Sequence, residues 1–218
     1  MKILMLAYPG MTLLDLVGPL QAWSAWPGND IHLVWKDAGP LPTDTGLDVV
    51  ATHDFAHSHP TPDILFVPGG SQPTRALMGD KETTDFLAAR GARAAWVTSV
   101  CTGALVLGAA GLLNGYKATT HWSATDELAP LGATYTKGRW VMDRNRVTGG
   151  GVTAGIDFGL ALIGELAGEE MARAVQLALE YAPQPPFKSG TPEDAWPETV
   201  ALVQSLLTAE QASVHQVF

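Results

Sequence analysis

Residues 94–113 read AAWVTSVCTGALVLGAAGLL, and this stretch decides the fold class. Its first part, Ala94–Val100, is rich in β-branched residues and predicts a strand, whereas Thr102–Leu113 predicts a helix. Cys101 stands between them, in a pattern similar to a nucleophile elbow with serine in place of the first glycine. Such a sharp turn from strand to helix lifts its side chain out of the fold. The stretch therefore predicts an available thiol on an α/β framework.

The rest of the chain alternates short apolar runs with helical patterns, which predicts βαβ units and a mostly parallel central sheet. Further strands are expected at Lys2–Tyr8, Ile31–Lys36, Asp63–Val67, Lys117–Thr120 and Arg144–Thr148. Further helices are expected at Leu14–Trp26, Lys81–Arg93, Ser123–Leu128, Ala154–Ala167 and Glu169–Tyr181. We expect one α/β domain over residues 1–218, in which residues 183–218 form a proline-rich arm and a C-terminal helix.

Composition excludes several classes of protein. The 218 residues are 46% hydrophobic and 16% charged, which is too apolar for a disordered chain. A net charge of −9 without a basic run argues against a nucleic-acid partner, because binding to phosphates requires cations. The apolar runs do not fit a membrane span, and the run before Pro9 is too short for a secretory signal. We therefore expect a cytoplasmic protein.

The unusual residues fall at the ends of predicted strands. Asp15 follows the first strand, Gly69 and Gly70 follow the strand ending at Val67, and Cys101 follows Val100. His121 and the three glycines at 149–151 follow the next two predicted strands. Parallel strands end at a shared edge of the sheet, where ligand crevices open. We expect these side chains to meet at one site.

The chemistry of that site follows from its residue types. Cys101 is the single cysteine, which excludes an internal disulfide, and a helix N-terminus behind it would lower the thiol pKa. Asp15 lies among apolar residues beside that thiol, so its pKa would be raised and it would act as a general acid. A helix N-cap is the other interpretation of Asp15. The backbone N–H groups of Gly70 and Thr102 are expected to form an anion-stabilising pair.

The remaining candidates are weaker. His121 either orients the thiol, lines the pocket or is a structural residue, and Gly150, Gly151 and Val152 are expected to line the pocket. The triple glycine lacks the spacing of a dinucleotide site. His53, His57 and His59 form a cluster without an evident closed ligand set, so no metal and no other cofactor is expected.

Several segments together resemble a known group of proteins. The chain is similar to the superfamily of the Parkinsonism-associated deglycase and the PfpI-type intracellular proteases, and within it to bacterial isocyanide hydratases. The segments that carry the resemblance are Asp15–Pro19 (DLVGP), Phe66–Gly70 (FVPGG), Thr98–Asn114 (TSVCTGALVLGAAGLLN), Ala118–Trp122 (ATTHW), Leu128–Ala133 (LAPLGA), Thr148–Phe158 (TGGGVTAGIDF) and Val175–Phe187 (VQLALEYAPQPPF).

The resemblance implies a flavodoxin-like three-layer α/β sandwich and a homodimer. It also implies a cofactor-free hydratase that converts an isocyanide and water into an N-substituted formamide. Carried over by position, the nucleophile is Cys101, the carboxylic acid is Asp15 and the accompanying hydroxyl belongs to Thr102. The mechanism expected from these residues proceeds through a cysteine thioimidate.

Each alternative function of this superfamily is distinguished by one feature of the sequence. A PfpI-type peptidase needs histidine directly after the cysteine, where this chain has Thr102. The glyoxalase or deglycase branch pairs its cysteine with a glutamate, whereas Asp15 is shorter. A transcription regulator built on this fold carries two helix-turn-helix units at its C-terminus, where this sequence predicts one short helix. A cysteine redox sensor stays open, since an exposed thiol of low pKa oxidises readily.

Overall fold

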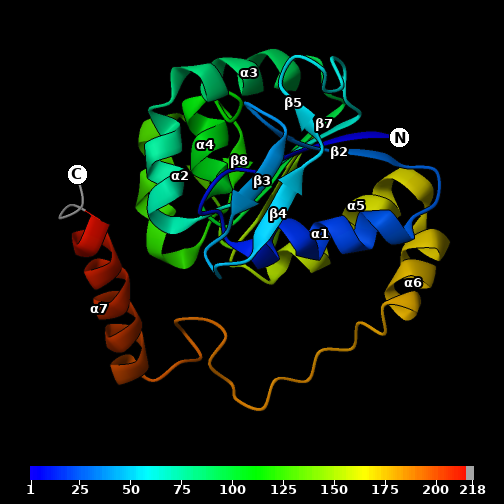
Figure 1. Cartoon of the computed structure of the whole chain (residues 1–218). Helices are drawn as coiled ribbons and strands as arrows, with labels where there is room; N and C mark the ends of the chain where they lie inside the picture. The colour runs from blue at the N-terminus through cyan, green and yellow to red at the C-terminus, as the bar shows by residue number, and fades with distance from the viewer. Residues whose placement is uncertain (215–218) are drawn as a thin grey trace. The chain divides into compact units, whose positions relative to one another are not determined.

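A seven-stranded sheet in the order β10-β11-β7-β6-β1-β2-β5 forms the centre of residues 1–180 (Figure 1). Its strands are β1 (Lys2–Leu6), β2 (Asp30–Trp35), β5 (His53–Asp54), β6 (Ile64–Val67), β7 (Trp96–Val100), β10 (Trp140–Asp143) and β11 (Arg146–Gly149). Neighbouring strands pair in parallel except β10 with β11, which are antiparallel. The predicted mostly parallel sheet is confirmed. All residues of β6 and β11 are buried, as expected of strands covered on both faces.

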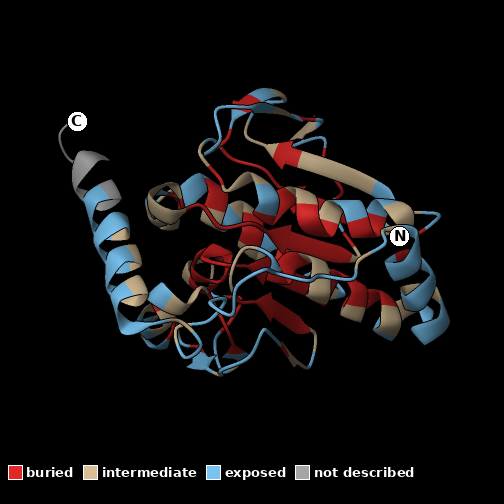
Figure 2. Ribbon diagram, turned by 90° about the horizontal axis from the view of Figure 1, so that it is seen from below, coloured by how far each residue is buried: buried red, intermediate tan, exposed pale blue. Residues whose placement is uncertain are grey.

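Helices cover both faces of this sheet. Figure 1 shows α2 (Ser71–Met78), α3 (Lys81–Gly91) and α4 (Gly103–Ala109) on one face, with α1 (Leu13–Ala25) and α5 (Ala154–Ala167) on the other. The helix α6 (Glu169–Ala178) follows α5. This is the three-layer, flavodoxin-like arrangement that the sequence predicts. Buried residues run through the strands and the inward faces of the helices (Figure 2).

The structure describes residues 1–214 of the chain, and the burial of its side chains through residue 209. Residues 1–180 form one compact unit, and a second unit begins at Tyr181. The second unit consists of an extended segment followed by α7 (Pro197–Val214), where the sequence predicts an arm and a helix. Within the described residues, no helix has both the length and the apolarity that crossing a membrane requires.

Some predicted elements differ from those observed. The predicted strand at Lys117–Thr120 is wrong for its second half: β8 covers Lys117–Ala118 and pairs with β9 (Thr134–Tyr135) outside the main sheet. Side-chain hydrogen bonds replace the strand ladder there, because the Thr119 N–H donates to the Thr148 hydroxyl at 2.8 Å. The predicted helix at Ser123–Leu128 is a kinked 3-10 segment, η1 (Trp122–Glu127), followed by a second, η2 (Ala129–Leu131).

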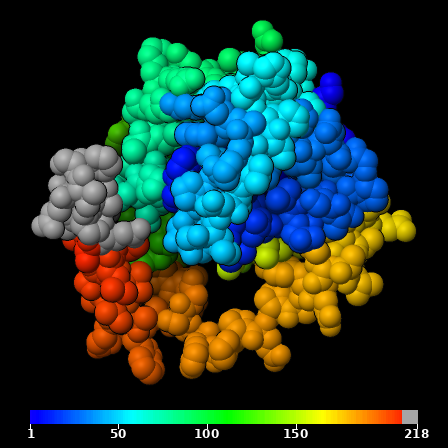
Figure 3. Space-filling model, viewed as in Figure 1, coloured from blue at the N-terminus to red at the C-terminus, as the bar shows by residue number. Residues whose placement is uncertain are grey.

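Other elements were not predicted at all. Helix α2 has only eight residues and begins with the polar run Ser-Gln-Pro-Thr-Arg, and β10 has only four residues. A hairpin of β3 (Gly39–Pro42) and β4 (Asp48–Ala51) lies on the face of the first unit shown in Figure 3. Two of its apolar side chains, Leu47 and Val50, are exposed.

Close packing of α1 on α5 fixes the position of the first turn of α1. A Cβ atom at Gly155 would lie 2.9 Å from the Pro19 ring, so only glycine allows this approach. One turn further along α5, the Gly159 carbonyl accepts a hydrogen bond from the Trp23 indole at 3.3 Å. Since Asp15 lies in the first turn of α1, this packing holds its carboxyl at the edge of the sheet.

A comparable contact fixes the start of α4. A Cβ atom at Gly103 would lie 2.3 Å from the Val67 carbonyl oxygen and 2.8 Å from that of Pro68, so backbone atoms would have to shift. We predict that Gly103→Ala lowers the free energy of unfolding by about 3 kcal/mol, the cost typical of overpacking a core. Urea denaturation measures it.

Gly79→Ala is the matched control, because its Cβ would meet ordinary contact with Ala76 at 3.6 Å. This variant should change the free energy of unfolding by less than about 0.5 kcal/mol. Equal effects of the two substitutions would contradict the predicted role of Gly103.

Candidate active site

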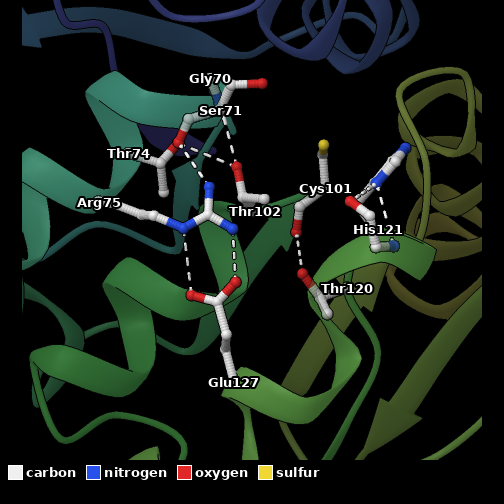
Figure 4. Close-up of polar contacts among 10 residues, drawn as sticks. Gly70, Ser71, Thr74, Arg75, Cys101, Thr102, Thr120, His121 and Glu127 are labelled. Atoms are coloured by element: carbon white, nitrogen blue, oxygen red, sulfur yellow. Dashed lines mark hydrogen bonds and ion pairs between the residues drawn. The ribbon is translucent and has the colours of Figure 1, made fainter. Parts of the chain in front are cut away.

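Cys101 occupies a strained turn that hydrogen bonds hold in place. Its φ is +55°, a conformation that costs a non-glycine residue about 1–3 kcal/mol. The Cys101 N–H donates to the carbonyls of Gly149 and Gly150 at 3.1 and 2.8 Å. The Cys101 carbonyl accepts from the Thr120 hydroxyl at 2.8 Å (Figure 4). Bonds on both sides of the residue therefore fix the turn, as in a nucleophile elbow. The predicted lifting of the side chain out of the fold is wrong, because Cys101 is buried.

Asp15 lies beside the thiol and is completely buried. Two hydrogen bonds join its helix turn to the end of β6: the Thr12 N–H donates to the Gly69 carbonyl at 2.9 Å, and the Gly69 N–H donates to Asp15 Oδ2 at 2.8 Å. The other carboxyl oxygen, Oδ1, is buried without a hydrogen-bond partner. A proton on this carboxyl belongs on Oδ1, because Oδ2 is already an acceptor. Asp15 is thus not acting as a helix N-cap.

Burial sets the proton affinity of both groups. It raises the pKa of Asp15 to about 7, against the opposing effects of the Gly69 N–H and the Cys101 thiol. It also raises the pKa of the Cys101 thiol well above its usual value, and the negative charge of Asp15 adds to that shift. The raised pKa of Asp15 agrees with the sequence prediction. The predicted lowering of the thiol pKa is wrong, because burial and the carboxylate outweigh the interactions with Thr102 that lower it.

The glycine pair after β6 allows the three groups to meet. A Cβ atom at Gly69 would lie 2.7 Å from Thr102 N and 2.8 Å from Asp15 Oδ2. The backbone N–H and the hydroxyl of Thr102 both oppose the rise in the thiol pKa of Cys101. The Gly70 N–H donates instead to the Thr102 hydroxyl at 3.2 Å. It is therefore occupied, where the sequence analysis expected a free donor beside the sulfur.

The buried hydroxyl groups of Thr74 and Tyr8 extend the hydrogen-bonded contacts of Thr102, and the sequence analysis identified neither. The Thr74 and Thr102 hydroxyls are 2.9 Å apart, and the Thr74 and Tyr8 hydroxyls are also 2.9 Å apart (Figure 4 shows the Thr74–Thr102 contact). Tyr8 lies after β1, at the same sheet edge as the other site residues, so its position was a signal that went unused. Thr74 lies on α2, which had no such signal.

The remaining predicted residues are His121 and the segment from Gly150 to Val152. His121 caps η1: its Nδ1 lies 2.7 Å from the Ser123 hydroxyl, and burial lowers the pKa of its ring. Gly150 accepts from Cys101 as described, and Gly151 lies next to the His121 ring, because a Cβ there would be 3.7 Å from His121 Cδ2. Val152 is half-buried beside Gly151. Figure 4 shows His121 on the other side of Cys101 from Thr102.

An ion pair fixes α2 relative to η1. The Arg75 guanidinium donates to both carboxylate oxygens of Glu127, and its Nη1 donates to the Ser71 carbonyl at 3.3 Å (Figure 4). A bidentate pair of this kind restrains orientation as well as distance. It holds the helix that carries Thr74.

Within the described residues, one group of side chains is close enough to share a metal ion: Asp30, His32 and His59. The rings of His32 and His59 are stacked with centroids 3.5 Å apart and an interplanar angle of 16°, and His53 stacks on the other side of His32. An ion must lie near the plane of each imidazole at about 2 Å from its nitrogen. The ring planes of His32 and His59 are nearly parallel and their centroids are 3.5 Å apart, so no point near both planes lies about 2 Å from a nitrogen of each ring. The two rings therefore pack against each other and do not share an ion.

The family model described as DJ-1/PfpI matches residues 1–165, which include the elbow, Asp15 and the glycine pair. The chain belongs to the DJ-1/PfpI family. It is 50% identical over 195 residues to an isonitrile hydratase of Pseudomonas putida, which is 89% of this chain and 85% of that protein.

The chain is also similar to a solved structure over nearly its whole length and to part of a longer regulator. The crystal structure of a ThiJ/PfpI family protein from Pseudomonas syringae matches with a TM-score of 0.92 and 49% identity, covering 96% of this chain and 86% of that one. A helix-turn-helix transcriptional regulator of Pseudomonas aeruginosa is 30% identical over 177 residues, 78% of this chain but 47% of the regulator.

The raised pKa of Asp15 predicts that this DJ-1/PfpI site destabilises the fold. Between the usual value of 3.8 and about 7, the native carboxyl holds a proton that the unfolded chain releases, so wild-type stability falls as pH rises through this range. Asp15→Asn removes the titration. Its stability relative to wild type should rise by on the order of 3 kcal/mol from about pH 4 to about pH 7 and then level off. Urea denaturation across this range tests it, and a difference independent of pH would contradict it.

Proposed function

We propose that this protein is an isocyanide hydratase, which adds water to an isocyanide and forms an N-substituted formamide. The observation that carries the proposal is the buried pair of Cys101 and Asp15, in which the Gly69 N–H occupies one carboxyl oxygen and the thiol interacts with the carboxyl. Its similarity to the isonitrile hydratase of Pseudomonas putida supports the same substrate class. The terminal carbon of an isocyanide accepts both a nucleophile and a proton, and the pair supplies both.

The first step forms a thioimidate. With its pKa near 7, Asp15 is partly ionised at neutral pH and accepts the proton of the thiol as the sulfur attacks. The sulfur bonds to the terminal carbon, and the electron pair of that carbon takes the proton from Asp15 Oδ1. The sulfur and the proton therefore add to the same carbon. Cys101 therefore does not need to be ionised before it attacks, which agrees with the raised pKa of its thiol.

The second step releases the product. The Asp15 carboxylate takes a proton from water, whose oxygen bonds to the thioimidate carbon, and that proton passes to the nitrogen. The carbon–sulfur bond of the tetrahedral adduct then breaks, the sulfur leaves with the bonding electrons, and the hydroxyl proton returns through Asp15. The formamide departs, and one water has been consumed. No cofactor is needed in this sequence.

Two other functions are less compatible with the site. A redox sensor needs a thiol of low pKa and good exposure, whereas Cys101 is buried and burial raises its pKa. A PfpI-type peptidase needs a histidine base directly after the nucleophile, where this chain has Thr102, whose hydroxyl lies 2.9 Å from that of Thr74. Dependence on one free cysteine also supports a reducing, cytoplasmic location.

We further propose that the protein is a homodimer. The second unit exposes the large apolar side chains Phe187, Trp196, Leu202 and Leu206, each more than half accessible. Exposed apolar side chains of this size are stabilised when a partner buries them. A second copy of the chain would bury them in a single symmetric interface.

An alkyl isocyanide assay tests the activity. Wild type should form the N-alkyl formamide, detected by mass spectrometry, and Cys101→Ala should form none above the uncatalysed background. Asp15→Asn should fold and lose at least about 100-fold in kcat, the usual contribution of a general acid and base. Asp85→Asn, an exposed acid paired with Lys81, is the matched control and should keep full activity. Absence of product with wild type would refute the hydratase assignment.

Sedimentation equilibrium tests the dimer. We expect a mass of twice the 23.0 kDa of one chain. Combining Phe187→Ser with Trp196→Ser should shift the mass toward the monomer, whereas Leu47→Ser, an equally exposed apolar residue on the β3–β4 hairpin, should not. A monomeric wild type would contradict this proposal and leave the hydratase assignment standing.

A further inference from the structure

Arg139 bonds to both ends of the short connection between β11 and α5. Its carbonyl accepts a hydrogen bond from the Gly150 N–H at 2.9 Å, which extends the β10–β11 ladder by one step. Its guanidinium bonds to the other end of the connection: Nη2 donates to the Thr153 hydroxyl at 3.0 Å, and Nε donates to Asp157 Oδ2 at 2.8 Å. One residue therefore fixes both where this connection starts and where it ends.

The same connection bonds to the backbone of the reactive cysteine. The Cys101 N–H donates to the Gly150 carbonyl at 2.8 Å and to the Gly149 carbonyl at 3.1 Å. Gly150 is thus bonded to Arg139 through its N–H and to Cys101 through its carbonyl. A residue with a φ of +55° keeps that conformation only while its surroundings hold it. The Gly150 carbonyl is one of the groups that do so.

We propose that Arg139 is a positioning residue for Cys101. Its ion pair with Asp157 holds the connection between β11 and α5, so that the Gly150 carbonyl keeps the cysteine in its strained turn. The effect on turnover rests on the proposed function. The effect on the Cys101 backbone does not depend on which substrate the enzyme takes.

The geometry of the ion pair suits orientation better than overall stability. Nε and Nη2 of Arg139 lie 2.8 and 2.5 Å from the same oxygen of Asp157, and Nη2 also reaches Thr153. The side chains of the pair are 50% and 28% exposed, so the pair adds little to the stability of the whole fold. A planar guanidinium with several fixed contacts nevertheless sets the direction in which α5 begins.

The first turn of α5 also packs against the helix that carries the proposed acid. A Cβ atom at Gly155 would lie 2.9 Å from the Pro19 ring and 3.8 Å from the Asp15 carbonyl oxygen, so α1 follows the position of α5 closely. The connection held by Arg139 therefore touches the backbone of the nucleophile at one end and the helix of the acid at the other. Loosening it should disturb the alignment of these two groups.

Hydrogen exchange of the Cys101 amide, followed by nitrogen-15 NMR, tests the proposal, because this N–H is the group that Gly150 holds. Arg139→Met removes the guanidinium and keeps an apolar stem. It should lower the protection of the Cys101 amide by about fivefold, the contribution typical of an exposed ion pair. The Val97 amide, which donates to the Asn145 carbonyl at 3.0 Å at the far end of the β7–β11 pair, should keep its protection.

Turnover gives a second measurement. In the hydratase assay, Arg139→Met should lower kcat by about fivefold and change KM by less than about twofold, because alignment is lost and the substrate site is kept. Arg173→Met is the matched control, since Nε and Nη2 of Arg173 donate in the same way to one oxygen of Glu169 on α6, at 2.9 and 2.6 Å. This control should leave both kcat and the protection of Cys101 unchanged.

A double-mutant cycle separates the ion pair from other effects of the substitution. Asp157→Asn removes the charge of the partner, and it should lower the Cys101 protection in the same direction as Arg139→Met. The double variant should lose no more protection than Arg139→Met alone, because both changes break one interaction. Asp157→Asn also serves as the test if Arg139→Met does not fold.

Unchanged Cys101 protection in folded Arg139→Met would overturn the proposal. An equal loss at Val97, an equal loss in Arg173→Met, an additive loss in the double variant or an unchanged kcat would also overturn it. Lowered Cys101 protection in Arg139→Met, combined with a wild type that forms no formamide, would refute the hydratase assignment and support the role of Arg139. The two proposals can therefore fail independently.

Discussion

The hydrogen bond from the Gly69 N–H to Asp15 Oδ2 connects the fold to the chemistry of the site. It joins the end of β6 to the first turn of α1, and it occupies one carboxyl oxygen so that the other is left for the proton. Without burial this bond would lower the pKa of Asp15, as N–H donors to a carboxylate do. Burial is the stronger effect, and the balance leaves the pKa near 7, where one group can both accept and deliver a proton.

The rest of the fold brings the sulfur to that oxygen and keeps it there. Gly103 lets α4 approach the backbone at the end of β6, and Gly155 lets α5 approach the Pro19 ring of α1, and a larger residue would prevent either contact. The Cys101 backbone is held in a strained conformation by bonds to Gly150 and Thr120. The strained Cys101 backbone and the buried Asp15 carboxyl both lower the stability of the fold. We attribute this loss of stability to a site that must present a sulfur and a proton to one substrate carbon.

The architecture was readable from the sequence because its signals are local. Apolar runs such as Ile64–Val67 identify strands, and the shared direction of parallel strands places Asp15 and Cys101 at one edge. The conformation of Thr119 and Thr120 was not readable, since their bonds go to side chains and backbone from other segments. Thr74 was missed for another reason: it lies on α2, a helix of only eight residues that begins with a polar run containing Pro73. The thiol pKa depends on burial and on the charge of Asp15, and no local pattern encodes that balance.

The central claim is that a single carboxyl beside the nucleophile gains and loses its proton near neutral pH. The most direct measurement is a carbon-13 NMR titration of the Asp15 side-chain carboxyl in the intact protein, with Asp15→Asn to assign the signal. The account predicts a midpoint near pH 7. A midpoint near pH 4, the usual value for aspartate, would contradict it and leave the sulfur without its proton carrier.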